Sequence, residues 1–328
     1  MIDITYFHRN PSSGYSIGKV SRTYISEIEK TENVKHVYIP AAKAGLWSIL
    51  KNMWYAYRHQ NIIGINHITG AVHYLAFVLP HKKTVVTLHD IRFFEESKGL
   101  KRLLFKVFWL YFPFLHVAKV VCISEETKRK VIKYHLCSPE KLIVIPNAVD
   151  DSFKQIEYTF NAINPRILCI GTGENKNLYR TIEALKGIPC HLRIIGTLNS
   201  ALLEHLQSCR IDYSNAFHLS DTEIIDEYVQ SDIVSFVSCY EGFGMPIIEA
   251  QAVGRPVLTS DIYPMKDIAA KGAVLVDPYD ISAIRTGFMS IIEKKELRDE
   301  IVKEGLCNVK NYTPMYVANE YLRIYHTL

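Results

Sequence analysis

Two glutamates, Glu241 and Glu249, bracket a short glycine-containing stretch in the segment YEGFGMPIIEAQAVGRPV, residues 240–257. A carboxylate can accept several hydrogen bonds, so each glutamate could hold the paired hydroxyl groups of a sugar ring. The glycines between them permit close approach of the backbone to a ligand. Pro246 suits the first turn of a helix, whose free N–H groups favour anionic or oxygen-rich groups. The spacing therefore predicts a ligand in which two sugars flank phosphates.

These glutamates also have a simpler interpretation. Glu249 is expected in the first turn of the helix, where a carboxylate complements the positive end of the helix dipole. Glu241 would then be a solvated loop residue. Taken by themselves, the two glutamates favour this structural interpretation, and the surrounding residues must decide.

The complete string is more specific, because it resembles the E-G-F-G-x-P-x-x-E signature of retaining GT-B glycosyltransferases of family 4. The resemblance extends over nearly the whole chain and is carried by SIGKVSRTYISEI (16–28), TLHDI (87–91), VCISEETKRKVIKY (121–134), VIPNAVD (144–150), ILCIGTGENKNLYRTIEAL (167–185), the segment 221–260 and NYTPMYVANEYLRIYHTL (311–328). It implies a GT-B fold, in which two Rossmann-like, doubly wound parallel-sheet domains face a cleft.

The resemblance assigns roles to residues in both halves of the chain. It implies that Glu249 holds the nucleotide ribose, that Glu241 contacts the donor sugar and that Lys176 meets the diphosphate. His89 is implied to contact the sugar, and the alternative is a core histidine bonded to the backbone. Glu241, His89 and Lys176 are thus the implied catalytic residues. Donor contacts are also implied for Gly18, Gly171, Thr172, Phe243, Gly244, Met245 and Pro246.

One departure from the family concerns the phosphate loop GTGENKN, residues 171–177. The family usually carries an arginine shortly before the lysine, and none is present here. Arg180, one helical turn beyond Lys176, is a candidate substitute, with a solvated helix position as the alternative. The departure implies a changed diphosphate affinity or donor preference. On the acceptor side, we expect contributions from His67, His73 and Asp90.

Short apolar, β-rich runs alternate with helical segments, which predicts parallel sheets built from βαβ units. The expected strands are IDITYF, HVYIP, NIIGIN, TVVTLHD, KVVCIS and KLIVIP, then RILCIG, HLRIIG, NAFHLS, DIVSFVSC, PVLTS and AVLVD. A polar stretch, residues 147–165, is typical of an interdomain linker. We therefore expect an N-terminal acceptor domain (1–155) and a C-terminal donor domain (156–312). The resemblance adds a final helix (313–328) that crosses back to the first domain.

The composition is typical of a globular protein, with 48% hydrophobic and 22% charged residues. A net charge of +4 suits anionic small ligands or an anionic membrane surface, and it is too small for a nucleic-acid-binding protein. The seven cysteines are scattered and no pair of them has zinc-ligand spacing. The N-terminus lacks the pattern of a signal peptide. We expect a cytoplasmic protein that needs no cofactor and no metal, since the sequence offers no D-x-D motif.

Two segments of the first half, residues 43–60 and 98–116, combine basic residues with tryptophan, tyrosine, phenylalanine and leucine. This composition is typical of helices that lie in a membrane interface, whereas Pro113 and the interspersed charges argue against a span of about 20 residues. We hypothesise peripheral contact with the cytoplasmic face of an anionic membrane. The alternative is that both segments are ordinary helices packed on the sheet.

Together these features imply a hexosyltransferase that moves a sugar from a UDP- or GDP-sugar to a hydroxyl group of a glycan or lipid-linked glycan. In this family the reaction retains the anomeric configuration, needs no metal, and lets the departing phosphate take the acceptor proton. Two alternatives remain: a nucleotide-sugar epimerase of the same fold, which needs no acceptor, and a noncatalytic sugar-nucleotide-binding subunit. Both rank below the transferase, because both halves of the site are retained.

Overall fold

The computed structural model describes residues 1–13, 16–43 and 45–328. The chain forms two compact units: unit 1 comprises Met1–Ala148 and Pro314–Leu328, and unit 2 comprises Val149–Thr313. Each unit contains a six-stranded sheet whose neighbouring strands pair in parallel. The prediction of a doubly wound parallel sheet in each half of the chain is therefore confirmed.

The sheet of unit 1 has the strand order β2-β1-β3-β4-β5-β6. Its strands are β1 (Asp3–His8), β2 (Asn33–Tyr38), β3 (Ile65–Ile68), β4 (Thr84–Leu88), β5 (Lys119–Cys122) and β6 (Leu142–Val144). Its helices are α1 (Ser16–Ile28), α2 (Leu46–His59), α3 (Arg92–Glu95), α4 (Gly99–Leu104), α5 (Phe112–Leu115), α6 (Glu125–Lys133) and α14 (Pro314–His326). Short 3₁₀ turns are η1 (Pro11–Ser13), η2 (His73–Phe77), η3 (His81–Lys83) and η5 (Pro139–Lys141), and a π-helical stretch, η4 (Phe105–Tyr111), joins α4 to α5.

The sheet of unit 2 has the order β12-β11-β10-β7-β8-β9, which is the 3-2-1-4-5-6 order of dinucleotide-binding folds. Its strands are β7 (Arg166–Ile170), β8 (His191–Ile195), β9 (Asp212–Ala216), β10 (Ile233–Phe236), β11 (Val257–Ser260) and β12 (Val274–Val276). Its helices are α7 (Leu178–Leu185), α8 (Ser200–Ser208), α9 (Asp221–Val229), α10 (Met245–Ala252), α11 (Met265–Ala269), α12 (Ile281–Glu293) and α13 (Lys295–Asn308), with the 3₁₀ turns η6 (Glu174–Lys176) and η7 (Val309–Tyr312).

The central strands read as continuous apolar or small-residue runs because helices cover both faces of a parallel sheet. Every residue of β4 and of β10 is buried. Two predicted strands are shifted. The side chain of Asn61 accepts hydrogen bonds from the backbone N–H groups of Ile63 and Gly64, at 3.1 and 2.7 Å. Because of this turn, β3 begins only at Ile65. The strand predicted at NAFHLS (215–220) is instead β9, which spans Asp212–Ala216 and ends where its pairing with β8 stops.

The stretch predicted as an interdomain linker is packed against unit 2. The guanidinium of Arg255 lies over the ring of Tyr158, with Cζ 3.7 Å from the ring centre. Asp232 accepts a hydrogen bond from the backbone N–H of Asn161 at 2.8 Å. The units therefore divide after Ala148, not at residue 155, because the following segment makes its contacts with unit 2.

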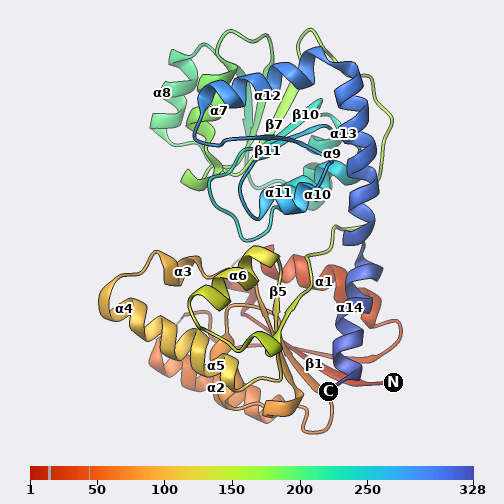
Figure 1. Cartoon of the computed structure of the whole chain (residues 1–328). Helices are drawn as coiled ribbons and strands as arrows, with labels where there is room; N and C mark the ends of the chain where they lie inside the picture. Colours follow the sequence, from red (N-terminus) through yellow and green to blue (C-terminus); the bar gives the residue numbers. More distant parts are fainter. Residues whose placement is uncertain (14–15, 44) are drawn as a thin grey trace. The chain divides into compact units, whose positions relative to one another are not determined.

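The last helix, α14, lies beside α1 in unit 1 (Figure 1). Its buried tyrosines bond to the sheet: the hydroxyl of Tyr325 is 2.5 Å from Nδ1 of His67, and that of Tyr321 is 3.0 Å from Oγ1 of Thr87. Nε2 of His67 is 2.8 Å from the same threonine hydroxyl. Because these groups satisfy one another away from water, α14 is held to unit 1 by a buried polar network as well as by apolar packing.

Unit 1 is expected to lose stability as the pH falls below about 6.5, where histidine titrates in an unfolded chain. Burial lowers the pKa of His67 and His8 to about 3 and that of His73 to about 4. Between these values the unfolded state binds protons that the native state excludes. The free energy of unfolding should therefore decrease by up to about 1.4 kcal/mol per pH unit for each such histidine. All three tryptophans lie in unit 1, so urea unfolding followed by tryptophan fluorescence measures this loss.

Substitution of one network histidine separates this effect from general acid sensitivity. His67→Gln keeps a hydrogen-bonding side chain but removes a titrating ring, so the urea midpoint should depend less steeply on pH. His191→Gln, in unit 2, is the matched control and should leave the pH dependence of the fluorescence transition unchanged. An unaltered slope in His67→Gln would contradict the assignment of a neutral, buried imidazole.

Candidate active site

The strand order of unit 2 reverses between β7 and β10. The chain passes from β7 to β8 on one side of this point and from β10 to β11 on the other, so the two loops begin side by side and then lead to opposite halves of the sheet. In open α/β sheets this reversal marks the ligand-binding position at the carboxyl ends of the strands. The two loops meet there, because the backbone N–H of Cys239 donates to the carbonyl of Asn175 at 2.8 Å.

Lys176 and Glu241, both predicted as catalytic residues, are paired at this point. Nζ of Lys176 lies 2.7 Å from Oε1 of Glu241. The side-chain amide of Asn175 donates to the same oxygen at 3.0 Å, and the ammonium lies 4.6 Å from the ring centre of Phe236. The two side chains are only 23% and 15% exposed, so water screens this pair less than it screens a surface pair. The arrangement fixes the Lys176 ammonium and the Asn175 side-chain amide beside the carboxyl ends of β7 and β10.

Gly171 makes room for this lysine. Its φ of +90° lies in the region that favours glycine, and a Cβ at this position would lie 2.9 Å from Cε of Lys176. Thr172 follows it and packs on Gly196, where a Cβ would lie 2.8 Å from the threonine Cγ2. Lys176 itself ends the turn η6, and α7 begins two residues later at Leu178. The loop after β7 therefore brings the predicted phosphate-binding residues to the strand end.

The signature segment forms the turn and the helix that the sequence predicts. Gly244, with φ of +126°, precedes α10, and Met245 and Pro246 are the first two residues of that helix. The side chain of Phe243 is buried, with its ring centre 6.0 Å from that of Tyr312, which leaves only its backbone for a ligand. Pro246 has no N–H group, so the amide of Met245 is the helix-start donor that can meet an anion.

Glu249 lies later in α10 than predicted. It is the fifth residue of the helix, and the first turn contains no acidic residue. Because the helix-dipole effect decreases beyond the first turn, the helix dipole does not explain why a glutamate occupies this position. Oε2 of Glu249 instead accepts a hydrogen bond from the hydroxyl of Tyr228 at 2.5 Å. Burial raises the pKa of Tyr228 well above its ordinary value, so the phenol remains a donor that orients the carboxylate.

Arg180, the candidate substitute for the missing arginine, is half-buried and bonded rather than solvated. Its Nη1 donates to Oδ1 of Asn177 at 2.9 Å, and its guanidinium lies 5.5 Å from the ring centre of Tyr279. Asn177 adopts a φ of +59° ahead of α7 and donates to the carbonyl of Pro278 at 2.6 Å. Arg180 therefore braces the start of α7, next to Lys176.

In unit 1, His89 follows β4 and is half-buried. Its Nε2 donates to the carbonyl of Thr69 at 2.9 Å, and no other residue in the described part of the chain bonds the ring. Burial lowers the pKa of His89, so the imidazole is neutral near pH 7 and Nδ1 is an acceptor. The hydroxyl of Thr69 in turn lies 3.0 Å from Nδ1 of His8, at the end of β1. This cluster could accept a hydrogen bond from a hydroxyl group.

Two other histidines predicted to line the acceptor side are core residues. His67 lies in β3, where both ring nitrogens are bonded within the buried network. His73 is buried, donates from Nδ1 to the carbonyl of Trp109 at 3.1 Å and packs on the ring of Phe114. Their positions do not support a role in binding an acceptor, because no ring nitrogen of His67 is left to contact a ligand and His73 is sealed beneath helices.

Asp90 and Gly18 are also placed by local structure. Asp90 is exposed, and its carboxylate accepts a hydrogen bond from the backbone N–H of Arg92 at 2.9 Å, at the start of α3. Gly18 is the third residue of α1 and is therefore helical. Among the residues that the structure describes, none would lie within 4 Å of a Cβ at this position.

Three supporting residues are missed by reasoning from the sequence. Tyr228 orients Glu249, Asn175 bonds Glu241, and His8 joins the cluster around His89. Asn175 is the most accessible to prediction, because it lies beside the lysine in the phosphate loop. The other two lie at the end of an amphipathic helix and at the end of the first strand, where nothing in the pattern distinguishes them from core residues.

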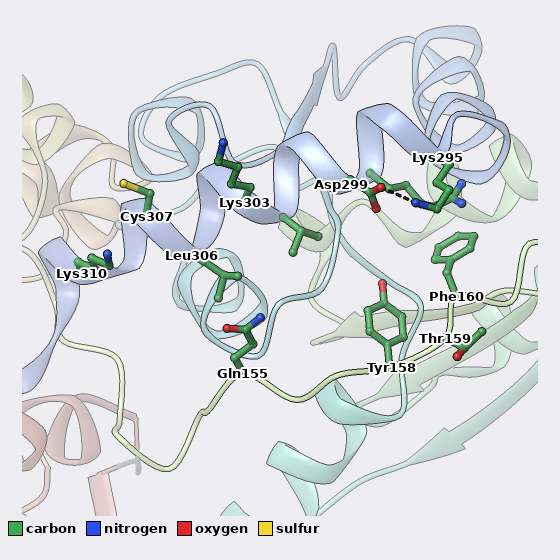
Figure 2. Close-up of a pocket in the computed structure, with 12 residues that line it drawn as sticks. Gln155, Tyr158, Thr159, Phe160, Lys295, Asp299, Lys303, Leu306, Cys307 and Lys310 are labelled. Carbon is green, nitrogen blue, oxygen red and sulfur yellow. Dashed lines mark hydrogen bonds and ion pairs between the residues drawn. The ribbon is translucent and has the colours of Figure 1, made fainter.

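A separate cavity of ≈ 1060 Å³ runs along α13 in unit 2 (Figure 2). The segment from Gln155 to Phe160 forms one wall and α13 the other. Three of its charged groups are engaged with the protein: Lys295 pairs with Asp299 at 2.7 Å, and Arg298 donates to the carbonyl of Ile291 at 2.8 Å. None of the predicted site residues lines it, so this cavity is not the candidate active site.

Two family models match consecutive parts of the chain. Residues 21–153 match the model described as Glycosyltransferase Family 4, and residues 151–306 match the model described as Glycosyl transferases group 1. The chain therefore belongs to the group 1, or family 4, glycosyltransferases. It is accordingly a retaining glycosyltransferase with the GT-B fold, as its sequence resemblance predicts.

Two named relatives are O-antigen chain mannosyltransferases. It is 22% identical over 264 residues to O-antigen chain mannosyltransferase B of Escherichia coli, covering 72% of this chain and 69% of that protein. It is 22% identical over 317 residues to O-antigen chain mannosyltransferase RfbU of Salmonella typhimurium, covering 92% and 82%. The crystal structure of Anabaena HepE in complex with UDP-glucose matches with a TM-score of 0.78 at 13% identity, over 100% of both chains. That structural likeness shows the fold alone.

Replacing Gly171 by alanine is expected to weaken diphosphate binding about tenfold, the equivalent of one charge-assisted hydrogen bond. The new Cβ would displace Lys176 from Glu241, in addition to straining the backbone by about 1–2 kcal/mol. Gly187→Ala is the matched control, because Gly187 has φ of +73° but nothing lies within 4 Å of its Cβ position. Calorimetric titration with pyrophosphate and with UDP or GDP measures both variants. Equal affinities in the two would contradict the placement of Lys176.

Proposed function

We propose that the chain transfers a hexose from a UDP- or GDP-sugar to a hydroxyl group of a glycan or lipid-linked glycan. The observation that carries this proposal is the Lys176–Glu241 pair beside the start of α10, at the strand-order reversal of unit 2. A fixed cation next to a helix-start amide suits a diphosphate. The two glutamates suit the sugars on either side of it.

Glu249 is the ribose-binding residue in this proposal. A carboxylate has about four acceptor positions and can accept hydrogen bonds from both ribose hydroxyls, and the bond from Tyr228 orients it. Glu241 plays the corresponding part for the transferred sugar and also holds Lys176 in place. The set of proposed donor contacts also includes Gly18, Gly171, Thr172, Phe243, Gly244, Met245 and Pro246.

The reaction requires stabilisation of charge rather than a covalent intermediate. The bond between the anomeric carbon and the diphosphate oxygen breaks as the acceptor oxygen bonds to the same face, and the acceptor proton passes to the departing phosphate. Lys176 stabilises the negative charge that develops on the diphosphate. His89, neutral and with Nδ1 as an acceptor, receives a hydrogen bond from a sugar hydroxyl. The step as written uses no metal ion.

The names of relatives guide the choice of donor. Two are O-antigen chain mannosyltransferases, and HepE was crystallised with UDP-glucose. These names support a hexose donor and a polysaccharide acceptor. UDP- and GDP-linked glucose and mannose are therefore the first donors to test.

Donor binding is tested by thermal shift with UDP, GDP and their glucose and mannose conjugates. A ligand at about 100 times its dissociation constant adds roughly 2.7 kcal/mol to native-state stability, which raises the unfolding midpoint measurably. One nucleotide family should stabilise the wild type, and Glu249→Ala should lose the shift. Glu300→Ala, an exposed substitution on α13, is the control and should retain it.

Turnover is measured separately, with the stabilising donor and lipid-linked glycan extracts as acceptor. Glu241→Ala should bind the nucleotide but transfer sugar at least about 100-fold more slowly, because both the sugar contact and the anchor for Lys176 are lost. Unimpaired transfer by both glutamate variants would refute the assignment of the site. Conversion of the donor without acceptor would indicate an epimerase instead.

We also propose that unit 1 docks on an anionic membrane through two exposed helical faces. On α2 the residues Trp47, Leu50, Trp54 and Tyr57 follow helical spacing on one face, and the two tryptophans are 83% and 65% exposed. A packed interior helix would turn this face inward, but the only buried residues of α2 are Asn52 and Ala56. The alternative of two ordinary sheet-packed helices therefore leaves these apolar side chains unexplained.

The second face lies on the continuous α4, η4 and α5 segment, where Leu100, Leu104, Phe108 and Tyr111 are exposed at helical spacing. Both helical segments pack on η2 of unit 1. Basic residues accompany the apolar ones on each: Lys51 and Arg58 on α2, and Lys101 and Lys106 on the other segment. No helix in the described part of the chain has the length and apolar character needed to cross a bilayer. Apolar side chains flanked by cations suit the surface of an anionic membrane.

Sedimentation with vesicles tests this surface. The protein should sediment with vesicles containing about 30% anionic lipid at low salt, and should be released at high salt because each basic residue near the surface contributes only about 1 kcal/mol. The double variant Trp47→Ser/Trp54→Ser should remain in the supernatant. Ile163→Ser, which removes a side chain of unit 2 that is 85% exposed, is the control. Failure of the wild type to bind anionic vesicles would contradict the proposal.

A further inference from the structure

Three side chains of unit 2 that are not among the predicted site residues bring metal-ligating atoms together. Glu183 lies on α7, His205 lies on α8, and Cys209 directly follows α8. One ligand atom from each lies within 4.8 Å of the other two. His205 and Cys209 are four residues apart, which places both on the same face of one helical segment toward α7. The topology thus assembles a carboxylate, an imidazole and a thiol from two neighbouring helices.

The separations among the three ligand atoms are close to those of a tetrahedral site. Sγ of Cys209 lies 3.3 Å from Oε1 of Glu183 and 4.0 Å from Nε2 of His205, and the third distance, from Nε2 to Oε1, is 3.6 Å. Zinc bonds of about 2.0–2.3 Å at tetrahedral angles require ligand separations of about 3.4–3.6 Å. Shifts of about 0.4 Å or less therefore convert the cluster into a coordination site without rotation of any helix.

The donor set and its surroundings favour zinc. A thiolate, an imidazole and a carboxylate form the mixed sulfur, nitrogen and oxygen set that Zn²⁺ accepts, whereas Mg²⁺ and Ca²⁺ require oxygen ligands. Cys209 is buried, whereas the side chains of His205 and Glu183 are 21% and 37% exposed. A cavity of ≈ 320 Å³ lined by Glu183 and His205 opens beside the cluster, which provides an entry path and space for a water molecule as fourth ligand.

We propose that Glu183, His205 and Cys209 bind one Zn²⁺ ion that fastens α7 to α8. In the structure the thiol of Cys209 donates to Glu183, and Nε2 of His205 is 3.2 Å from the carbonyl of Tyr179. On binding, the thiol proton passes to solvent, the imidazole carries its proton on Nδ1, and three coordinate bonds replace these hydrogen bonds. The ion fixes the carboxyl-terminal part of α7, whose other end follows the loop that carries Lys176. It is a structural clamp and takes no part in the transfer step.

Cobalt substitution tests the site directly, because Co²⁺ bound to a thiolate gives a charge-transfer absorption band that free cysteine and oxygen ligands do not give. The purified full chain, stripped with a chelator, should develop this band with one equivalent of Co²⁺ and lose it when Zn²⁺ is added. Cys209→Ser should abolish the band. Cys307→Ser, which removes the exposed cysteine of α13, is the matched control and should retain it.

Zinc affinity, measured by competition with a chromogenic chelator, provides an independent readout. Glu183→Gln alters a partly exposed side chain and is expected to fold normally, yet it should weaken Zn²⁺ binding by more than about tenfold, since even outer-shell partners contribute about 10- to 100-fold. Circular dichroism confirms that each variant is folded. The proposal is overturned if the wild type gives no thiolate band, if Cys209→Ser retains it, or if Cys307→Ser abolishes it.

Discussion

The reversal of strand order between β7 and β10 is the constraint on which the candidate site depends. Right-handed crossovers on the two sides of this point carry the chain in opposite directions, so two loops end next to each other with no helix between them. Lys176 and Glu241 come from those two loops and can pair only because their strands are neighbours in the sheet. Gly171 and Gly244 adopt the positive φ values that the two loops need to reach this geometry.

The ion pair also sets the electrostatics that a donor would meet. Because Glu241 and Asn175 hold the site before any ligand arrives, the lysine pays little entropy when an anion binds. Its ammonium is partly shielded from water, and the adjacent Glu241 carboxylate offsets part of its charge, so the pair contributes positioned N–H donors rather than a net positive charge. This preorganisation offers a physical reason why the loop can lack the arginine that the family usually carries, while Arg180 braces the helix behind it.

The sequence was sufficient to predict the parts of the structure that depend on local pattern. The apolar runs predict both parallel sheets, and the signature from Tyr240 to Val257 predicts the turn at Gly244 and the helix after it. Partners that are distant in sequence could not be predicted. His67 and His89 both follow apolar runs, yet only the pairing of His67 with Tyr325, 258 residues away, makes it a core residue. Tyr228 and Glu183 likewise gain their roles from neighbours on other elements.

In the proposed function, the carboxyl edge of unit 2 between β7 and β10 binds the nucleotide sugar. Hydrogen–deuterium exchange in the presence and absence of a UDP- or GDP-sugar tests it most directly, because it reports which backbone segments a ligand protects. One of the two donors should protect residues 171–177 and 239–249, with no change along the cavity of α13. Protection confined to other segments, with these two loops unchanged, would contradict it.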